Sequence, residues 1–292
     1  MPAIAAAWRS LYPFASHHID LGSLRLHYLD EGPRHAPPVL LLHGNPTWSF
    51  YWRELVRDLR DRFRVVAPDH LGCGLSDKPQ QWPYRLAGHV DNLERLVLDL
   101  DLRGITLGVH DWGGAIGFGL AARQPERIAR LIVFNTAAFR SRALPWRIAA
   151  CRIPLLGPLA VRGFNGFALA AMVMATAKGL GSDVRDGYLA PYGSWRERVA
   201  LLRFVQDIPM QPSHTSWPAL VAIEESLPRF RDRPMLIVWG ERDWCFTPAF
   251  REEWQRRFPQ AEAHPIADAG HYVVEDAIDV VRPLVRRFLE RP

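Results

Sequence analysis

The sequence predicts an α/β protein, with a mostly parallel sheet of eight strands flanked by helices and an inserted helical cap. Two observations predict this class. Short β-rich runs alternate with helical patterns over the first 135 residues, and no convincing strand appears between residues 136 and 213. The chain has 292 residues, which is long for one ordinary domain and short for two, and 48% of them are hydrophobic. We therefore expect one large core that carries a cap.

Eight segments have the composition of strands, and the first two differ from the rest. Residues 17–21 and 24–30 flank Gly22-Ser23, a pattern typical of an antiparallel hairpin. Helical spacing separates several of the later strands, and a helical pattern follows each of the last two. Because alternating strands and helices are joined by crossovers, the later strands are expected to lie parallel. These strands are continuous apolar runs at 39–42, 63–67, 105–109, 128–134, 235–239 and 263–266, and the helices between them fall at 52–59, 86–100 and 113–122.

The middle of the chain breaks this alternation. Its aromatic and helical patches are interrupted by prolines and glycines, which are the residues that most often end regular structure. We therefore assign residues 136–213 to the helical cap, and residues 1–135 and 214–292 to the core domain. The interrupting residues are Pro145, Pro154, Pro158, Gly163, Gly193 and Pro209.

Positive charge is concentrated in this predicted cap. The whole chain carries a formal charge of +5, and residues 136–213 hold ten Arg or Lys and four Asp or Glu, a balance of +6. The pattern indicates a solvated basic surface, or a face that meets an anionic partner or a membrane surface. The basic residues form no tract and accompany no nucleic-acid-binding signature, which argues against nucleic acid as a partner.

Other features indicate a cytoplasmic protein without a metal or a cofactor. No apolar run approaches the roughly 18 residues that a transmembrane helix needs, and residues 1–8 lack the basic region of a secretory signal. The three cysteines, Cys73, Cys151 and Cys245, are odd in number and do not have metal-ligand spacing. We therefore expect free thiols in a reducing compartment.

The strongest functional signal is the segment Gly108-Val109-His110-Asp111-Trp112-Gly113-Gly114. It follows a buried strand and opens a helix, which is the context of a nucleophile elbow, a sharp turn that pushes one side chain into a pocket. Gly113 and Gly114 supply the small residues that a closely packed helix needs. Asp111 occupies the nucleophile position in place of serine, and Val109 stands where the serine pattern has glycine. Taken alone, Asp111 would also fit an ordinary helix N-cap.

Other polar residues follow neighbouring strands in register with Asp111. His43-Gly44-Asn45-Pro46 follows the third predicted strand, Asp243 the seventh and His271 the eighth. Open α/β sheets bind their ligands at the carboxyl ends of the strands, so we expect these side chains to meet there. Asp111, Asp243 and His271 come in the chain order nucleophile, acid, histidine.

Over nearly its whole length the chain resembles an α/β-hydrolase, and specifically the haloalkane dehalogenase family, which has an aspartate nucleophile followed by tryptophan, as in Asp111-Trp112. The resemblance implies that Asp111, Asp243 and His271 are catalytic. It also implies that the Asn45 amide and the Trp112 indole N–H hold a leaving anion, as neutral donors that can point into a dry pocket. Some members place the acid after the sixth strand. Here that strand ends at Asn135-Thr136 without a carboxylate, so the resemblance assigns the acid to Asp243.

Four further segments resemble the β-lactone decarboxylases of bacterial long-chain olefin biosynthesis, which belong to the same family. This resemblance implies that a cis-3,4-dialkyl-oxetan-2-one with long alkyl chains is converted to a cis-alkene and CO₂. It also implies a β-lactone synthetase and a condensing enzyme as partners in a multienzyme assembly. The apolar cap residues would suit such a small hydrophobic substrate, and some of them must pack onto the core. The four segments are Asn135-Thr136-Ala137-Ala138-Phe139, Arg162-Gly163-Phe164-Asn165, Leu189-Ala190-Pro191-Tyr192 and Arg203-Phe204-Val205-Gln206-Asp207-Ile208-Pro209.

The core motifs leave other activities open. Haloalkane dehalogenation is the main alternative, because halide and carboxylate are both anions that the same donors could hold. An epoxide hydrolase shares the aspartate nucleophile and needs two cap tyrosines, for which Tyr188 and Tyr192 are available, but Asn45 argues against it. A non-catalytic binding module could keep the fold, yet it would be expected to have lost a catalytic residue.

Overall fold

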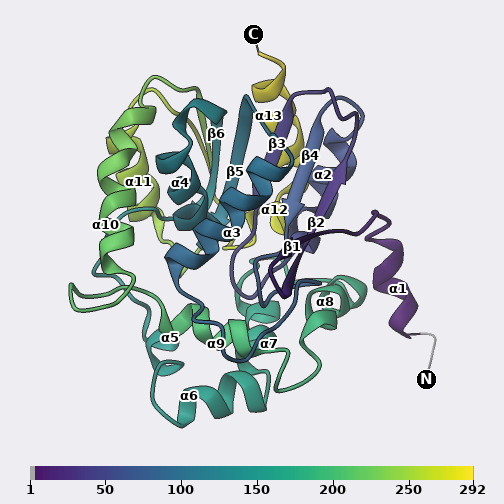
Figure 1. The fold of residues 1–292 in the computed structure, drawn as a ribbon, viewed down its shortest axis with the longest axis vertical. Coiled ribbons are helices and arrows are strands. Elements are labelled where there is room, and N and C mark those ends of the chain that lie inside the picture. Colours follow the sequence, from purple (N-terminus) through teal and green to yellow (C-terminus); the bar gives the residue numbers. More distant parts are fainter. Residues whose placement is uncertain (1–3, 292) are drawn as a thin grey trace.

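The computed structural model describes residues 4–291 and contains one eight-stranded sheet, in the order β1-β2-β4-β3-β5-β6-β7-β8 (Figure 1). Strands β1 and β2 pair antiparallel, β2 pairs antiparallel with β4, and every other neighbouring pair is parallel. The bounds are β1 His17–Leu21, β2 Leu24–Glu31, β3 Pro38–Leu42, β4 Arg64–Pro68, β5 Ile105–Asp111, β6 Ile128–Thr136, β7 Met235–Gly240 and β8 Glu262–Ile266.

The predicted α/β class and the eight strands are confirmed, and each strand lies within two residues of its predicted bounds. The hairpin turns between Leu21 and Leu24, where Gly22 has a φ of 72°, a left-handed conformation that glycine adopts without a steric penalty. All seven residues of β5 are buried, as expected for a central parallel strand covered on both faces.

Alternate side chains along each strand pack into two hydrophobic clusters, one on each face of the sheet. In β3, Leu40 and Leu42 join one cluster, whereas Val39 and Leu41 join the other. Helices α3, α4, α10 and α11 contribute to the first cluster, and α2, α12 and α13 to the second. Their bounds are α2 Arg53–Leu59, α3 Leu86–Asp99, α4 Trp112–Arg123, α10 Trp217–Ser226, α11 Pro248–Arg257, α12 Val273–Asp276 and α13 Ile278–Glu290.

The segment between β6 and α10 forms a group of helices at one end of the sheet, the lower end in Figure 1. The N-terminal helix α1 (Ile4–Ser10) packs against one of them, α8. The division into a core at 1–135 and 214–292 and a cap at 136–213 stays a prediction, and "cap" is used below for this segment. Its helices are α5 Trp146–Ala150, α6 Leu156–Pro158, the π-helix η3 Leu159–Gly163, α7 Gly166–Met174, α8 Ser182–Leu189, η4 Ala190–Tyr192 and α9 Val199–Gln206.

Apolar helices of the cap are short. Within residues 4–291 no single helix has both the length and the apolar composition needed to cross a membrane. The helical stretches Leu156–Gly163 and Gly166–Met174 together reach that length and composition, but they meet at an angle of 70°.

Candidate active site

Asp111 lies at a sharp turn where β5 ends and α4 begins, as the elbow motif predicts. Its φ of 50° and ψ of −125° lie outside the ordinary regions for a non-glycine residue, a strain that is typical of functional sites. The two glycines that follow give room for this turn. A Cβ atom on Gly113 would collide with the Leu42 carbonyl, and one on Gly114 would collide with the Thr136 hydroxyl.

Val109 stands where the serine pattern has glycine, and the structure gives the reason that the elbow tolerates it. A Cβ atom on Gly117 of α4 would lie 2.7 Å from the Val109 Cγ1. The close approach of helix and strand is therefore made possible by a glycine on the helix, six residues after Asp111.

Backbone N–H groups bond to the Asp111 carboxylate. The Asn45 N–H donates to Oδ1 at 2.7 Å, and the Trp112 N–H also bonds to the carboxylate. The other oxygen, Oδ2, lies 3.7 Å from the His271 Nε2. Burial raises the pKa of Asp111 above its ordinary value, against the opposing effects of His271 and the two N–H donors. One oxygen is thus fixed, while the second faces His271 at the edge of a cavity.

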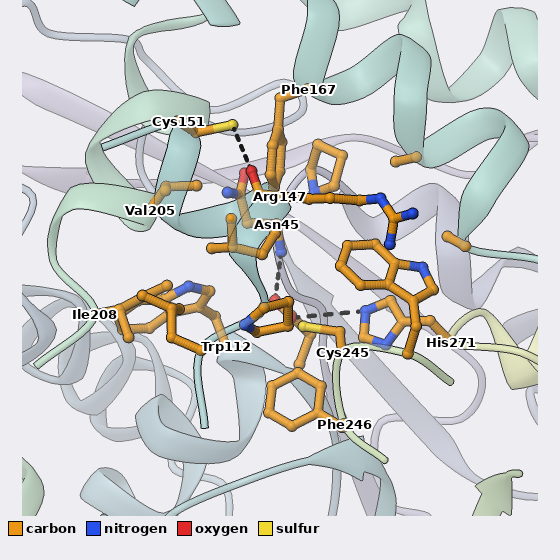
Figure 2. A pocket seen from close by; sticks show the side chains of 18 of the residues that line it. Asn45, Trp112, Arg147, Cys151, Phe167, Val205, Ile208, Cys245, Phe246 and His271 are labelled. Carbon is orange, nitrogen blue, oxygen red and sulfur yellow. Dashed lines mark hydrogen bonds and ion pairs between the residues drawn. The ribbon is translucent and has the colours of Figure 1, made fainter. Parts of the chain in front are cut away.

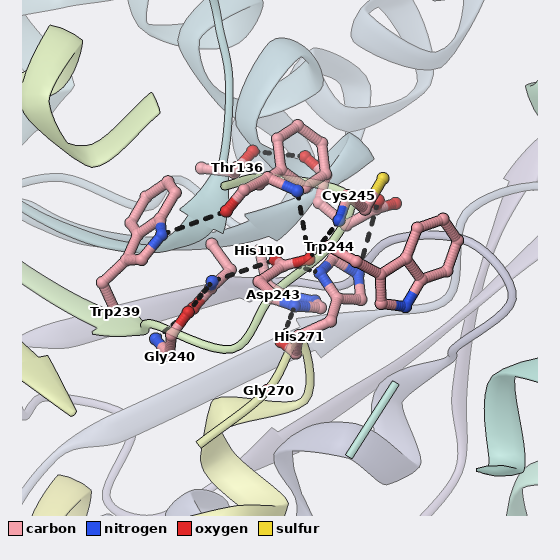
Figure 3. A network of polar contacts seen from close by, with 12 residues as sticks. His110, Thr136, Trp239, Gly240, Asp243, Trp244, Cys245, Gly270 and His271 are labelled. Carbon is pink, nitrogen blue, oxygen red and sulfur yellow. Dashed lines mark hydrogen bonds and ion pairs between the residues drawn. The ribbon is translucent and has the colours of Figure 1, made fainter. Parts of the chain in front are cut away.

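His271 and Asp243 form a close pair (Figure 3). The His271 Nδ1 donates to the Asp243 Oδ2 at 2.7 Å, and the Asp243 Oδ1 accepts the N–H groups of Cys245 at 2.7 Å and Phe246 at 3.0 Å. Burial alone would lower the pKa of His271, but the charge and the hydrogen bond of Asp243 outweigh it, so the pKa lies above its ordinary value. The imidazole therefore presents Nε2 to Asp111 in a fixed orientation.

Sequence reasoning missed two residues that position this pair. Asn135 of β6 donates through Nδ2 to the Asp243 Oδ2 at 2.9 Å and to the Gly240 carbonyl at 3.1 Å. His110 donates through Nε2 to the His271 carbonyl at 2.9 Å, since a carbonyl oxygen can only accept, and burial lowers the pKa of His110. The signal for Asn135 was its place at the end of the sixth strand, which was interpreted only as the absence of a carboxylate there.

Asn45 and Trp112, the two predicted anion donors, both line the cavity next to Asp111 (Figure 2). One N–H of the Asn45 amide donates to the Leu201 carbonyl at 3.0 Å, and the other N–H of the amide has no acceptor in the described part of the chain. The Trp112 ring packs against Phe204 at 5.1 Å, and its Nε1 has no acceptor among residues 4–291. The structure thus brings two unused N–H donors to the edge of the site.

The cavity has a volume of about 510 Å³ and opens onto Asp111 and His271. Side chains from both the core and the cap line it, and most are apolar. The cap contributes Ile148, Val161, Phe167, Ala171 and Met174, and the core contributes Leu220, Phe246 and Phe250. Such a lining suits an apolar ligand that carries a small polar group at one end. Within residues 4–291 no group of three His, Cys, Asp or Glu side chains is arranged to hold a metal ion.

The tyrosines that an epoxide hydrolase would need do not lie at this cavity. The Tyr188 hydroxyl donates to the Glu275 carboxylate, and the Tyr192 hydroxyl donates to the Thr47 carbonyl at 3.3 Å. Neither residue lines the cavity. The structure therefore removes the observation that favoured an epoxide hydrolase.

Comparisons with known proteins show the family and several relatives of this chain. The model of the alpha/beta hydrolase fold family matches residues 37–154 and 185–278. The chain is 44% identical to a cis-3-alkyl-4-alkyloxetan-2-one decarboxylase of Shewanella oneidensis, over 96% of this chain and 90% of that protein. It is 36% identical to a haloalkane dehalogenase of Mycolicibacterium paratuberculosis, over 91% of this chain and 89% of that protein.

A solved structure extends the likeness to three dimensions. The haloalkane dehalogenase DbeA of Bradyrhizobium elkani is 26% identical and superposes with a TM-score of 0.85, covering 94% of this chain and 98% of that one. The family match, these identities and the arrangement of Asp111, Asp243 and His271 lead to one assignment. The chain belongs to the α/β-hydrolase family, in the group that includes these decarboxylases and the haloalkane dehalogenases.

Proposed function

We propose that this protein is a β-lactone decarboxylase that converts a cis-3,4-dialkyl-oxetan-2-one with long alkyl chains to a cis-alkene and CO₂. One observation carries the proposal. Asp111 presents a free carboxylate oxygen to an apolar cavity, in a chain that is 44% identical to a protein named for this activity. We propose Asp111, Asp243 and His271 as the catalytic residues, and the side chains of Asn45 and Trp112 as anion donors.

The first step opens the strained ring. The Asp111 Oδ2 attacks C4, the alkyl-bearing carbon bonded to the ring oxygen, and the bond between C4 and the ring oxygen breaks as the Asp111 ester forms. The departing ring oxygen becomes a carboxylate on C3. The second N–H of the Asn45 amide and the Trp112 indole N–H, which have no acceptor among residues 4–291, would stabilise this new charge.

The second step forms the alkene and regenerates the nucleophile. The bond from C3 to the carboxylate carbon breaks, its electron pair forms the C3–C4 double bond, and the C4–O bond to Asp111 breaks. The products are CO₂, the alkene and an ionised Asp111, and no water is consumed. Attack at C4 inverts that carbon, and an anti elimination then gives a cis-alkene from a cis-lactone.

Attack at the carbonyl carbon would instead give a mixed anhydride and leave an oxygen on C4. To reach an alkene, that oxygen would first have to take over the acyl group of Asp111. The configuration of C4 would then be retained, and an anti elimination would give a trans-alkene. The geometry of the product therefore distinguishes the two points of attack.

His271 has a different task in this reaction from the one it has in a hydrolysis. Burial raises the pKa of Asp111, so the nucleophile needs help to stay ionised. A protonated His271, whose own pKa is raised by Asp243, supplies a positive charge 3.7 Å from the Asp111 Oδ2. We infer that His271 keeps Asp111 ionised between turnovers.

Haloalkane dehalogenation is the second candidate. The 36% identity to a haloalkane dehalogenase and the two unused N–H donors, which could hold a halide, favour it. In that reaction Asp111 would displace halide from carbon, and a neutral His271 would then activate a water molecule to hydrolyse the ester.

Product analysis in H₂¹⁸O tests the choice. A cis-lactone should give cis-alkene and CO₂, and the Asp111 peptide should stay unlabelled after many turnovers because water never attacks the ester. A hydrolytic dehalogenase would instead release alcohol and halide, and ¹⁸O would enter the Asp111 carboxylate. Alcohol release with labelled Asp111, and no alkene from the lactone, would reject the decarboxylase assignment.

We further propose that the protein acts in the cytoplasm, in long-chain olefin biosynthesis. Its substrate would then come from a β-lactone synthetase that closes the ring, preceded by a condensing enzyme that joins two long acyl chains. An assembly with those enzymes would shorten the path of a poorly soluble lactone between active sites. Co-purification of the three proteins from the native cell would test this arrangement.

A further inference from the structure

Large apolar side chains are exposed on the outer surface of the cap. Of the twelve large hydrophobic residues exposed in residues 4–291, nine fall between Trp146 and Trp195. The Leu155 side chain is 86% exposed and that of Phe164 is 71% exposed. We define the outer cap face by six of the nine, which belong to the segment containing α6, η3 and α7: Leu155, Leu156, Leu159, Phe164, Leu169 and Val173.

This face is separate from the substrate cavity. Ala160, Phe167 and Met174 of the same helical segment line the cavity, whereas none of the six residues of the outer cap face does. Helix α6 lies at the lower edge of the molecule in Figure 1, at the end opposite the C-terminus. The helices therefore have one apolar side toward the cavity and a second apolar side toward solvent, which packing onto the core does not explain.

The charges in the sequence stretch that contains the outer cap face have one sign. Residues 136–182 contain six Arg or Lys and no Asp or Glu. Two of the six pair with carboxylates of the core, Arg140 with Glu224 and Lys178 with Asp268. The other four have no carboxylate partner among residues 4–291: Arg142, Arg147, Arg152 and Arg162.

We propose that the outer cap face docks the protein onto the surface of a lipid bilayer with anionic headgroups. Apolar side chains flanked by arginines suit the boundary between headgroups and acyl chains. The apolar side chains would enter the bilayer, and the arginines would contact the phosphates. A second copy of this chain fits the face less well, because a two-fold contact would bring its unpaired arginines together.

Docking at this face would also serve the proposed function. This benefit rests on the proposed function, whereas the docking itself does not. A lactone with long alkyl chains partitions into bilayers, and the docked cap would place the cavity next to the bilayer that contains it. Vesicle binding itself needs no substrate. Loss of the decarboxylase assignment would therefore leave the docking proposal standing, and failure to bind vesicles would leave the chemistry standing.

Vesicle flotation with the full chain tests the proposal. The wild-type protein should float with vesicles of equal parts phosphatidylglycerol and phosphatidylcholine, and much less with phosphatidylcholine alone. The double variant Leu155→Asp/Leu156→Asp should bind the anionic vesicles at least about tenfold more weakly. Each lost leucine removes several apolar carbons that would otherwise be buried in the bilayer. Both leucines are exposed and lie outside the cavity, so turnover of detergent-dispersed substrate should stay at the wild-type level.

Matched variants separate the outer cap face from general effects. Leu98→Asp places the same charge at an exposed leucine of α3 and should leave vesicle binding unchanged. Arg152→Gln, three residues before Leu155, should weaken binding to anionic vesicles about fivefold, as expected for one basic residue near such a surface. Arg25→Gln, at an exposed site on β2, should have no effect.

Two results would overturn the proposal. One is equal flotation of the wild type and the Leu155→Asp/Leu156→Asp variant. The other is sedimentation showing that the wild type self-associates and the variant is monomeric, while neither binds vesicles. In that case the outer cap face would be an interface between copies of this chain.

Discussion

Asn135 and His271 share one oxygen atom of Asp243. The Asn135 Nδ2 donates to the Asp243 Oδ2 at 2.9 Å, and the His271 Nδ1 donates to the same oxygen at 2.7 Å. The Asn135 Oδ1 accepts the Gly240 N–H at 2.8 Å, which ties the amide to the end of β7. Asn135 therefore holds the acid in the orientation that the histidine needs.

Replacing Asn135 with alanine should lower kcat by about tenfold to a hundredfold, the cost of losing a buried hydrogen bond to a charged group. Asn135→Asp is the sharper variant, because it keeps the shape of the side chain but puts a second carboxylate beside Asp243. We expect it to be at least as impaired as Asn135→Ala. Steady-state kinetics of both variants check this, and wild-type kcat in Asn135→Asp would exclude the positioning role.

Asp111→Asn and Asp111→Ala should abolish turnover while the protein stays folded. Asparagine tolerates a positive φ and fills the same space, so the elbow should be preserved without a nucleophile. Product assays and thermal unfolding measure the two effects separately. We expect the Tm of Asp111→Asn to equal or exceed that of the wild type, because the asparagine side chain buries no charge. Near-wild-type activity in either variant would remove Asp111 from the mechanism.

Asn45→Ala and Trp112→Phe should each reduce the rate of the chemical step by about 10² to 10³, the typical effect of losing one preorganised donor to a developing anion. Trp112→Phe is the more informative variant because it removes the N–H donor but keeps an aromatic ring, although a smaller one, against Phe204. Single-turnover kinetics separate chemistry from binding. A change confined to substrate affinity would contradict the proposed role.

The pH profile should distinguish the two chemistries. For the lactone, kcat/KM should rise with pH as Asp111 ionises, above the ordinary carboxylate range because burial raises its pKa. It should then fall as His271 loses its proton, above the ordinary histidine value because Asp243 raises that pKa. Hydrolysis of a haloalkane ester needs neutral His271, so its rate would rise through the same upper pKa. A lactone profile that rises through both steps would exclude a protonated His271.

His271→Ala should behave differently with the two substrate classes. With a haloalkane, removal of the base should trap the alkyl ester on Asp111 after one burst of halide. With a β-lactone, the alkene should still form at a reduced rate, because Asp111 leaves without water. Mass spectrometry of the intact variant after incubation with each substrate measures the adduct. A stable haloalkane adduct at a useful rate, with no alkene from the lactone, would reverse our preference.

The strands and the order of the catalytic candidates can be predicted from the amino-acid sequence alone. A buried parallel strand needs a continuous apolar run, and an elbow needs small residues after the nucleophile, so both features are local and visible in the chain. The placement of Asp111, Asp243 and His271 after successive strands predicted their meeting, because parallel strands end at one edge of the sheet.

Contacts between side chains far apart in the sequence, and the side chains that face solvent, depend on how the helices and strands pack in three dimensions. Asn135 and Asp243 lie 108 positions apart, and no local pattern links an amide at one strand end to a carboxylate past another. The same holds for the cap. Phe164 and Phe167 are the same residue type three positions apart, yet Phe164 is exposed on the outer cap face and Phe167 lines the cavity. The hydrophobicity of a residue gives the free energy gained when its side chain leaves water. The orientation of its helix decides whether that side chain contacts the core, the cavity or solvent.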